Sequence, residues 1–381
     1  MASGNAVLSI CIPTFNRAAM LRTCLAELRP VVRALPFAVE VLISDNHSQD
    51  DTDIVLREIN LEEWAEDDGM TLRVIRPAHR LEAIEHYFEV MRHARGIYAH
   101  YLADDDALLP TGLEAAVIRM QNAPEMVACF SPQIEVEQGT DRVIEICSAP
   151  EKAPLVVKRG DYLEACSLLS GAPFHPEVPL VRAEAWRRHV VRPHKAYFGH
   201  WLLASLLKVG DVGIGGRDDA YYKHRLRPQT QGNDNQIQWE FAVDRMDQQR
   251  LGMELLFARM QAAGGRFSGE QLQQIGVFFV QRMALYADIA ARVCAHGGDF
   301  QGASELLARS ALWKGSDVAG IDSGTLERRV SAEIERRRGA IAGDLTVVDT
   351  PAQRHAAIVA GADPARVVAR EDLAVALRVM S

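Results

Sequence analysis

Residues 97–106 read Ile-Tyr-Ala-His-Tyr-Leu-Ala-Asp-Asp-Asp, an apolar stretch that runs directly into three consecutive carboxylates. The apolar part predicts a buried strand, at whose end Asp104, Asp105 and Asp106 fall. Like charges this close together need a cation, and oxygen ligands are those that Mg²⁺ and Mn²⁺ prefer. A solvated acidic turn is the alternative for an isolated run of this kind. The surrounding sequence favours the cation site.

The chain before this stretch alternates between two patterns. Short apolar runs predict strands at 7–12, 39–43 and 71–75. Apolar residues at helical spacing predict amphipathic helices that cover 20–28 and 81–91. Strands that alternate with helices are typical of a parallel sheet, so the sequence predicts an α/β fold.

Polar residues follow each of these strands. In an open parallel sheet the carboxyl ends of the strands meet at one edge. We therefore expect Thr14, Asp45 and the three carboxylates Asp104, Asp105 and Asp106 to share one pocket. After them, Thr111 and Glu114 have the spacing of a capping box, which predicts that Thr111 caps the next helix.

Four segments together carry a family resemblance: residues 9–17, 43–52, 94–98 and 104–106. In this order they resemble glycosyltransferase family 2, over roughly residues 5 to 230. The resemblance implies the GT-A fold, a Rossmann-like, mainly parallel sheet flanked by helices. It also implies transfer of a sugar from a nucleotide-diphosphate donor, with inversion at the anomeric carbon.

The resemblance assigns roles to residues of the predicted pocket. Asp45 would accept a hydrogen bond from the nucleobase ring, although an Asp before Asn46 is also a good turn residue. Asp104 and Asp106 would hold Mn²⁺ or Mg²⁺. We expect UDP as the nucleotide, with dTDP or GDP as alternatives. The residues assigned to the donor are Pro13, Thr14, Asn16, Arg17, Asp45, Arg80, Asp104 and Asp105.

Residues 220–224 resemble the Tyr-x-x-His segment of a rhamnosyltransferase- and abequosyltransferase-like branch of the family. The resemblance implies that His224 is a further ligand of the metal or the diphosphate. An ordinary packing or surface histidine is the alternative. Lys223 and Arg225 add positive charge, which can steady phosphate oxygens or keep the segment in water.

Three positions depart from the family pattern. Ala103 replaces the leading Asp of the acidic string, and Arg80 and Glu82 replace the usual Asn and Gly, so the donor sugar cannot be inferred. His200 stands where similar enzymes carry an acidic general base. A histidine can serve as a base near neutral pH, although packing is an equal explanation.

Two acidic residues compete with His200 for the role of base. Glu177 and Asp219 lie in the same half of the domain, and the sequence does not distinguish among the three. The acceptor is equally open between a polysaccharide, a lipid-linked sugar and a small or carrier-bound natural product. The competing function is a sugar-nucleotide-binding scaffold or regulator without activity. A nucleotidyltransferase is disfavoured, because a Gly-rich phosphate loop with a Lys is absent after the first strand.

Composition limits the remaining classes. The chain has 381 residues, 48% of them hydrophobic, and a formal net charge of −9. That charge gives no reason to expect nucleic acid as a partner. No apolar stretch approaches the roughly 20 residues that span a bilayer, and the first residues show no signal pattern. We therefore expect a cytoplasmic protein without a transmembrane segment.

The order of patterns predicts three parts. Residues 1–235 form the glycosyltransferase domain, 236–340 a helical region, and 341–381 a small α/β appendage with strands near 345–349 and 366–369. The helical region would cover the acceptor cleft, provide packing support or form the surface of a homodimer. The turn-rich residues 227–235 form the linker before it.

Overall fold

The computed structural model describes most of the N-terminal two thirds of the chain. The described residues are 6–59, 70–137, 139–147, 153–171, 178–192, 197–226, 235–264, 268–270, 273, 280, 283–284, 287, 290, 305–306, 346–348, 353, 356 and 367–369. The chain divides into two compact units. The first comprises residues 1–194, 198–229 and 255–266, and the second comprises the rest.

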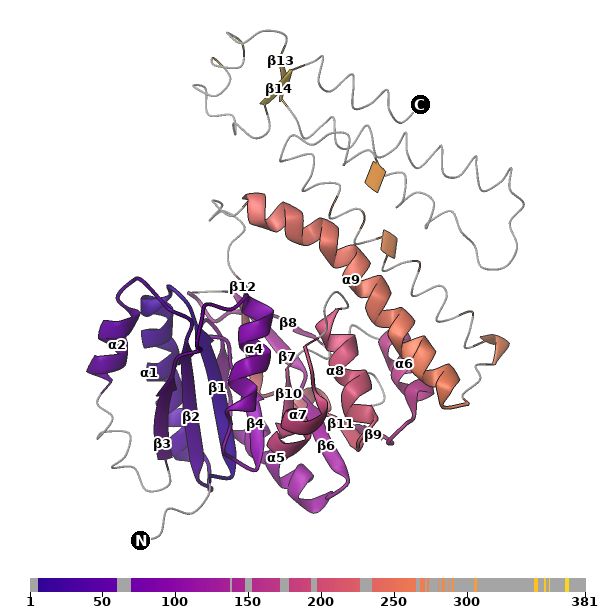
Figure 1. Cartoon of the computed structure of the whole chain (residues 1–381), viewed down its shortest axis with the longest axis horizontal. Helices are drawn as coiled ribbons and strands as arrows, with labels where there is room; N and C mark the ends of the chain where they lie inside the picture. The colour runs from indigo at the N-terminus through magenta and orange to yellow at the C-terminus, as the bar shows by residue number, and fades with distance from the viewer. Residues whose placement is uncertain are drawn as a thin grey trace. The chain divides into compact units, whose positions relative to one another are not determined.

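The first unit is built on an eight-stranded sheet with the strand order β3-β2-β1-β4-β10-β6-β11-β9 (Figure 1). The four strands β3, β2, β1 and β4 are mutually parallel, whereas β10 runs antiparallel to both of its neighbours. Strand β11 is parallel to β6 and antiparallel to β9. The bounds are β1 Leu8–Thr14, β2 Val39–Asp45, β3 Met70–Ile75, β4 Tyr98–Tyr101, β6 Met126–Phe130, β9 Leu155–Val157, β10 Pro179–Arg182 and β11 Asp211–Ile214.

Helices cover both faces of this sheet (Figure 1). Helices α1 and α5 lie against each other on one face, with α2 packed on α1, while α4, α7 and α8 form a contiguous layer on the other. Helix α6 packs against α8. The bounds are α1 Ala18–Ala34, α2 Thr52–Glu58, α4 Ala83–Arg92, α5 Pro110–Asn122, α6 Tyr162–Gly171, α7 Ala183–His189 and α8 Phe198–Leu207.

A second, four-stranded sheet has the order β5-β12-β7-β8. Strand β12 is antiparallel to β5 and parallel to β7, and β7 and β8 form a hairpin. The bounds are β5 Ala107–Leu108, β7 Gln133–Glu137, β8 Val143–Cys147 and β12 Tyr222–Leu226, and a 3₁₀ turn, η1, covers Arg217–Asp219. Since β5 directly follows the three carboxylates, this sheet brings β12 beside them.

The predicted α/β fold with a mixed, mainly parallel sheet is confirmed. The strands predicted at 7–12, 39–43 and 71–75 correspond to β1, β2 and β3, and the first two are almost wholly buried, as central parallel strands are. The prediction of a capping box at Thr111 and Glu114 is wrong. Helix α5 begins at Pro110, its N-cap is Leu109, and no side chain caps it. Proline's fixed φ suits the first helical position, which places Thr111 one residue inside the helix.

Beyond residue 226 the structure describes few elements. Helix α9 covers Asn235–Ala262, and a parallel pair joins β13, Thr346–Val348, to β14, Val367–Ala369. Both strands agree with the pattern in the sequence. Most of the predicted helical region, and residues 227–234 of the predicted linker, lie outside the described residues. In the described part of the chain no helix has the length and apolar character needed to cross a membrane.

One buried carboxylate, that of Glu40, joins three neighbouring strands of the eight-stranded sheet. Glu40 in β2 is 3% exposed, accepts the hydroxyl of Ser9 in β1 and pairs with Arg73 of β3 at 2.8 Å. It also accepts the backbone N–H of Arg95 at 2.9 Å. The carboxylate is thereby paired and hydrogen-bonded, the condition under which a buried charge is tolerated.

Gly96 joins this network where the chain enters β4. Its N–H donates to Ser9 Oγ at 2.8 Å. A Cβ at this position would lie 2.7 Å from Ser9 N and 2.8 Å from both Leu8 C and Tyr98 O, all of them backbone atoms. Glycine is therefore required sterically, because backbone atoms inside a sheet cannot move aside as a flexible side chain can.

We predict that Gly96→Ala lowers the free energy of unfolding by about 2 kcal/mol or more, since the added methyl overpacks a sheet interior. Gly269→Ala is the matched control, because nothing lies within 4 Å of its added Cβ. Urea unfolding followed by circular dichroism measures both variants. Equal stability of the two variants would contradict the steric requirement at Gly96.

Candidate functional site

The strand ends meet at one edge of the sheet as predicted, but Thr14 and Asp45 line neither of the two cavities described below. Thr14 at the end of β1 lies in register with Asp45 at the end of β2, and half-buried Pro13 lies opposite Ser44. Thr14 Oγ1 donates to Asp104 Oδ2 at 2.7 Å, across 90 residues of sequence. Thr14, Asp45 and Asp104 are 2%, 1% and 3% exposed. One edge of the sheet therefore collects these polar groups.

The loops after β1 and β2 are joined by hydrogen bonds at this edge. Asn16 has a left-handed φ of 52°, which Asn tolerates better than most residues. Its backbone N–H donates to Ser48 Oγ at 2.9 Å, and its Oδ1 accepts the Gln49 N–H at 2.7 Å. Asp50 Oδ2 accepts the N–H of Ala18, the first residue of α1. Asn16 is thus engaged in holding the loop of Arg17 in position.

The loop after β3 is held by Asn46, a residue that the sequence gave no reason to single out beyond its turn chemistry. The Asn46 amide donates to the carbonyl of Leu81 and accepts its N–H, both at 2.8 Å. His47 also lies 2.9 Å from the Pro77 carbonyl through Nε2. Two neighbouring loops at this edge are therefore fixed to each other by a pair of hydrogen bonds, which resembles the pairing of two strands.

Asp45 and Arg80, which the resemblance assigns to the donor, each contact other residues of the protein. Asp45 accepts the Ser48 N–H at 3.0 Å through Oδ1 and pairs with Arg76 through Oδ2. Arg76 is 48% exposed, so its guanidinium covers the buried carboxylate from the solvent side. Arg80 stacks its guanidinium over the ring of Phe15, 4.2 Å from the centroid. The sequence indicated Arg80 but missed Arg76.

Arg17 pairs with two of the three carboxylates. Its Nη1 lies 2.9 Å from Asp104 Oδ1 and 3.2 Å from Asp105 Oδ2. Burial raises the pKa of Asp104 above its usual value, while Arg17 and the Thr14 hydroxyl act in the opposite direction. The pKa of Arg17 is raised, because its attraction to Asp104 and Asp105 exceeds the effect of burial. The guanidinium therefore remains charged beside them.

Asp106 is held from β12. It is 3% exposed, and its Oδ2 accepts the hydroxyl of Tyr222 at 2.6 Å while Oδ1 accepts the backbone N–H of Arg225 at 2.8 Å. His224 Nδ1 lies 3.4 Å from the same Oδ2. Burial, followed by the charge of Asp106, raises the pKa of Tyr222 well above its usual value, so the phenol keeps the proton it donates. Tyr222 is a contact that the sequence did not single out, although it lies in the quoted Tyr-x-x-His segment.

Asp105 is the most accessible of the three carboxylates, with a side chain 18% exposed, and it lines two cavities. The first cavity has a volume of about 270 Å³. Its polar end is formed by Asp105, Asp106, Gln133, Tyr222 and His224. Its apolar walls come from Ala83, Ile84, Tyr87, Tyr101, Ala103, Val178 and Phe198. Carboxylates and aromatic rings around one small space are typical of a site for a hydroxylated ring.

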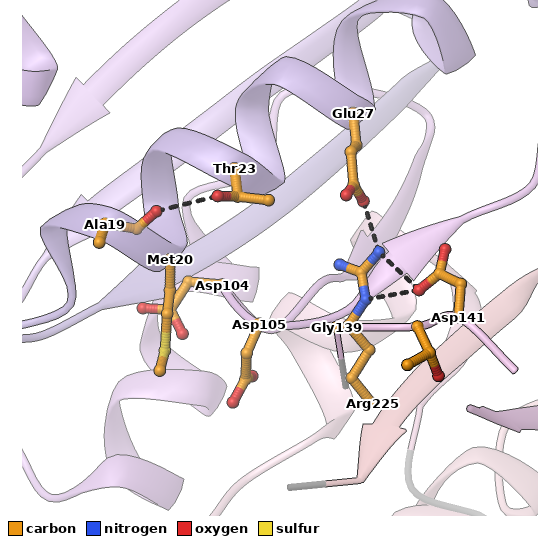
Figure 2. Close-up of a pocket in the computed structure, with 10 residues that line it drawn as sticks. Ala19, Met20, Thr23, Glu27, Asp104, Asp105, Gly139, Asp141 and Arg225 are labelled. Carbon is orange, nitrogen blue, oxygen red and sulfur yellow. Dashed lines mark hydrogen bonds and ion pairs between the residues drawn. The ribbon is translucent and has the colours of Figure 1, made fainter. Parts of the chain in front are cut away.

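The second cavity, of about 630 Å³, lies on the other side of the carboxylates, between α1 and the β7–β8 turn (Figure 2). Arg225 crosses it. Its guanidinium bonds Glu27 of α1 at 2.7 Å and Asp141 of the turn at 3.2 Å (Figure 2). Lys223 pairs with Asp141 at 3.4 Å. The positive charges that the sequence placed after Tyr222 therefore tie β12 to α1 and to the hairpin.

The three candidate bases have different surroundings. Asp219 accepts Arg119 Nη2 and the Gly216 N–H, both at 2.8 Å. Against the effect of partial burial, these contacts lower the pKa of Asp219. His200 is 6% exposed in α8, and the first cavity is lined by Phe198 of that helix and not by His200. Glu177 lies outside the described residues.

Of the predicted metal ligands, Asp106 and His224 line the first cavity, whereas Asp104 lines the second. Within the described residues, however, no three His, Cys, Asp or Glu side chains are arranged as they stand to hold one ion. Asp104 is bonded to Thr14 and Arg17, and Asp106 to Tyr222 and Arg225. The donor chemistry suits a hard divalent cation, because carboxylate oxygens carry further lone pairs beyond these bonds.

Comparisons with known proteins bear on this site. Residues 9–161 match the family model described as "Glycosyl transferase family 2". Among solved structures, S. aureus TarS 1-349 in complex with UDP is 14% identical, with 87% of this chain and 91% of that chain covered and a TM-score of 0.49. The mannosyltransferase PcManGT from Pyrobaculum calidifontis in complex with GDP-Man and Mn²⁺ is 15% identical, with 99% and 87% covered and a TM-score of 0.45. No curated protein matches the chain.

The matched residues contain β1, β2 and β4 and all the groups that meet at the edge of the sheet: Thr14, Arg17, Asp45 and the three carboxylates. The same segments carried the resemblance in the sequence. The chain is therefore similar to glycosyltransferase family 2 over residues 9–161, and its assignment as a glycosyltransferase rests on this match.

Proposed function

We propose that this glycosyltransferase is metal-dependent and inverting, and that it moves a sugar from a nucleotide-diphosphate donor to a nucleophile of an acceptor. The acceptor classes are a polysaccharide, a lipid-linked sugar and a small or carrier-bound natural product. The observation that carries the proposal is the convergence of Thr14, Arg17, Asp45 and the carboxylates at one edge of the sheet. A diphosphate needs cations beside it, and this edge holds both ligands for a cation and the guanidinium of Arg17.

We propose that Mn²⁺ or Mg²⁺ is held by Asp105 and Asp106, with Asp104 and His224 completing the set. Asp105 faces both cavities, and Asp106 and His224 line the first. When bound, such an ion neutralises charge that develops on the departing diphosphate. Thr14 holds the Asp104 side chain, and Tyr222 and the Arg225 N–H hold Asp106, so that both carboxylates keep one orientation.

The nucleotide end of the donor would lie over Asp45 and Arg76. Asp45 is fixed by the Ser48 N–H, and the exposed Arg76 is well placed to meet a nucleobase or ribose oxygen. UDP is the first nucleotide to test, followed by dTDP and GDP. The sugar would occupy the first cavity, whose volume of about 270 Å³ suits one ring rather than a whole sugar nucleotide.

The finer assignment to a rhamnosyltransferase- and abequosyltransferase-like branch rests on residues 220–224. Tyr222 bonds Asp106 and His224 lies 3.4 Å from it, so this segment supplies groups to the carboxylate site. That placement supports a functional role for the Tyr-x-x-His segment. We propose the branch on this ground alone.

For the base, we favour His200 over Asp219. An inverting displacement places the base across the sugar from the diphosphate. Arg119 and the Gly216 N–H hold Asp219 and lower its pKa, which makes it a weaker base. His200 lies in the first turn of α8, two residues after Phe198, which lines the first cavity. Glu177 remains the third candidate.

A second candidate function is a sugar-nucleotide-binding scaffold or regulator. The observation in its favour is that neither Asp219 nor His200 lines the first cavity. Metal-dependent hydrolysis of the donor, however slow, is expected of a transferase and not of a pure binding protein.

We predict that one of UDP, dTDP and GDP binds to the parent protein only with Mn²⁺, and that Asp105→Asn weakens this binding by roughly 10- to 100-fold or more, because a ligand of the metal is neutralised. Isothermal titration calorimetry with and without Mn²⁺ measures both. Glu184→Gln is the control, since Glu184 is exposed on α7 and pairs with Arg188 of the same helix, away from the carboxylates.

The outcomes of this titration are separable. Loss of binding in Asp105→Asn with binding retained in Glu184→Gln supports the site. If no nucleotide binds the parent with or without the metal, the proposed donor site is wrong. Metal removal with EDTA should abolish binding to the parent, and full retention would contradict the role of the metal.

We further predict that Asp219→Asn retains donor hydrolysis within about threefold, whereas His200→Gln loses most of it and shifts its pH profile, since general bases contribute roughly 100-fold or more. Hydrolysis of the sugar nucleotide, followed over pH, measures both. Asp219→Asn should instead cost about 1 kcal/mol of stability. Because the folded-state pKa of Asp219 is lowered, this difference is present above about pH 4 and disappears as the pH falls through that pKa.

A tenfold or larger loss of hydrolysis in Asp219→Asn with unchanged stability would reverse the assignment. Equal hydrolysis by His200→Gln and the parent would remove His200 and leave Glu177 as the remaining candidate.

A further inference from the structure

Arg17 occupies an unusual position among the charged groups of the site. It immediately precedes α1, and the single nitrogen Nη1 bonds both Asp104 Oδ1 at 2.9 Å and Asp105 Oδ2 at 3.2 Å. The two carboxylates are 4% and 18% exposed at the side chain, whereas Arg17 is 38% exposed. The cation thus lies on the solvent side of two largely buried anions.

The negative charge of the third carboxylate, Asp106, is balanced by other groups. Asp106 accepts a phenol and a backbone N–H, and His224 lies farther away at 3.4 Å. These donors can stay in place when a metal binds, because they approach from the protein side. The contact that a metal would have to replace is therefore that of Arg17 with Asp104 and Asp105.

We propose that Arg17 is a resident counter-ion, which holds these two carboxylates in the metal-free protein and must be displaced before they can turn toward a divalent cation. The inference rests on the proposed function. A guanidinium and a divalent ion carry like charge and compete for the same oxygens, so they cannot both bond Asp104 Oδ1 and Asp105 Oδ2 at short range. It also accounts for the absence, within the described residues, of an assembled group of three metal ligands.

Only the side chain of Arg17 has to move. Its carbonyl accepts the Leu21 N–H at 2.9 Å in the first turn of α1, and the neighbouring Asn16 is bonded to Ser48 and Gln49. Asp104 keeps its bond to Thr14 when Arg17 leaves. The released guanidinium stays at the same edge of the sheet, where it can bond phosphate oxygens of the donor. Arg17 would thereby weaken binding of the metal alone and favour binding of metal and diphosphate together.

The test measures Mn²⁺ binding without nucleotide, by the electron paramagnetic resonance signal of free Mn²⁺. We expect Arg17→Gln to bind Mn²⁺ about tenfold more tightly than the parent, because a fixed positive charge is removed from two carboxylates. Arg17→Lys retains the charge and should stay within about threefold of the parent. Arg22→Gln is the matched control, since Arg22 lies on α1 and pairs with Glu58, away from the carboxylates, and it should leave the affinity unchanged.

Arg17→Ala serves as a second neutral variant if Arg17→Gln does not fold, and thermal unfolding is recorded on the same samples. Mn²⁺ affinity in the neutral variants that is equal to or weaker than the parent's overturns the inference, as does equal tightening in Arg17→Lys or Arg22→Gln. This failure is distinct from failure of the proposed function, which would appear as absence of nucleotide binding by the parent.

Discussion

The hydrogen bond from Thr14 Oγ1 to Asp104 Oδ2 joins the two strand ends on which the site depends. It links β1 to the loop after β4, while the β1–β2 register places Asp45 opposite Thr14. Because parallel neighbours end at the same edge, this bond of 2.7 Å and the β1–β2 register together place three distant segments side by side. The side-chain bonds of Asn16 and Asn46 then fix the loops around that point.

Burial of negative charge is the second constraint. Glu40, Asp45, Asp104 and Asp106 are each no more than 3% exposed, and each has its own set of donors. Arginines compensate three of them, whereas Asp106 relies on Tyr222, the Arg225 N–H and the nearby His224. Unpaired buried carboxylates would be costly, so the arginines are part of the fold as well as of the site.

The second sheet gives the site its other wall. Strand β12 pairs with β5, which directly follows the carboxylates, so Tyr222 and Arg225 reach Asp106 from a segment more than a hundred residues away. Arg225 extends this connection to α1 through Glu27 and to the β7–β8 turn through Asp141. Asp105 lies between the two resulting cavities and lines both.

Apolar periodicity is local and the geometry of parallel strands is general. The sequence was therefore sufficient to predict the α/β class, the first four strands and the meeting of Thr14, Asp45 and the carboxylates. It did not predict the second half of the sheet, whose strands are three to five residues long and too short to carry a clear period. Nor did it show that Arg76 covers Asp45, that Arg17 bridges two carboxylates or that Arg119 pairs with Asp219. These pairings arise in the folded chain, because a charged side chain's partner depends on which distant segment packs beside it and not on its neighbours in the sequence.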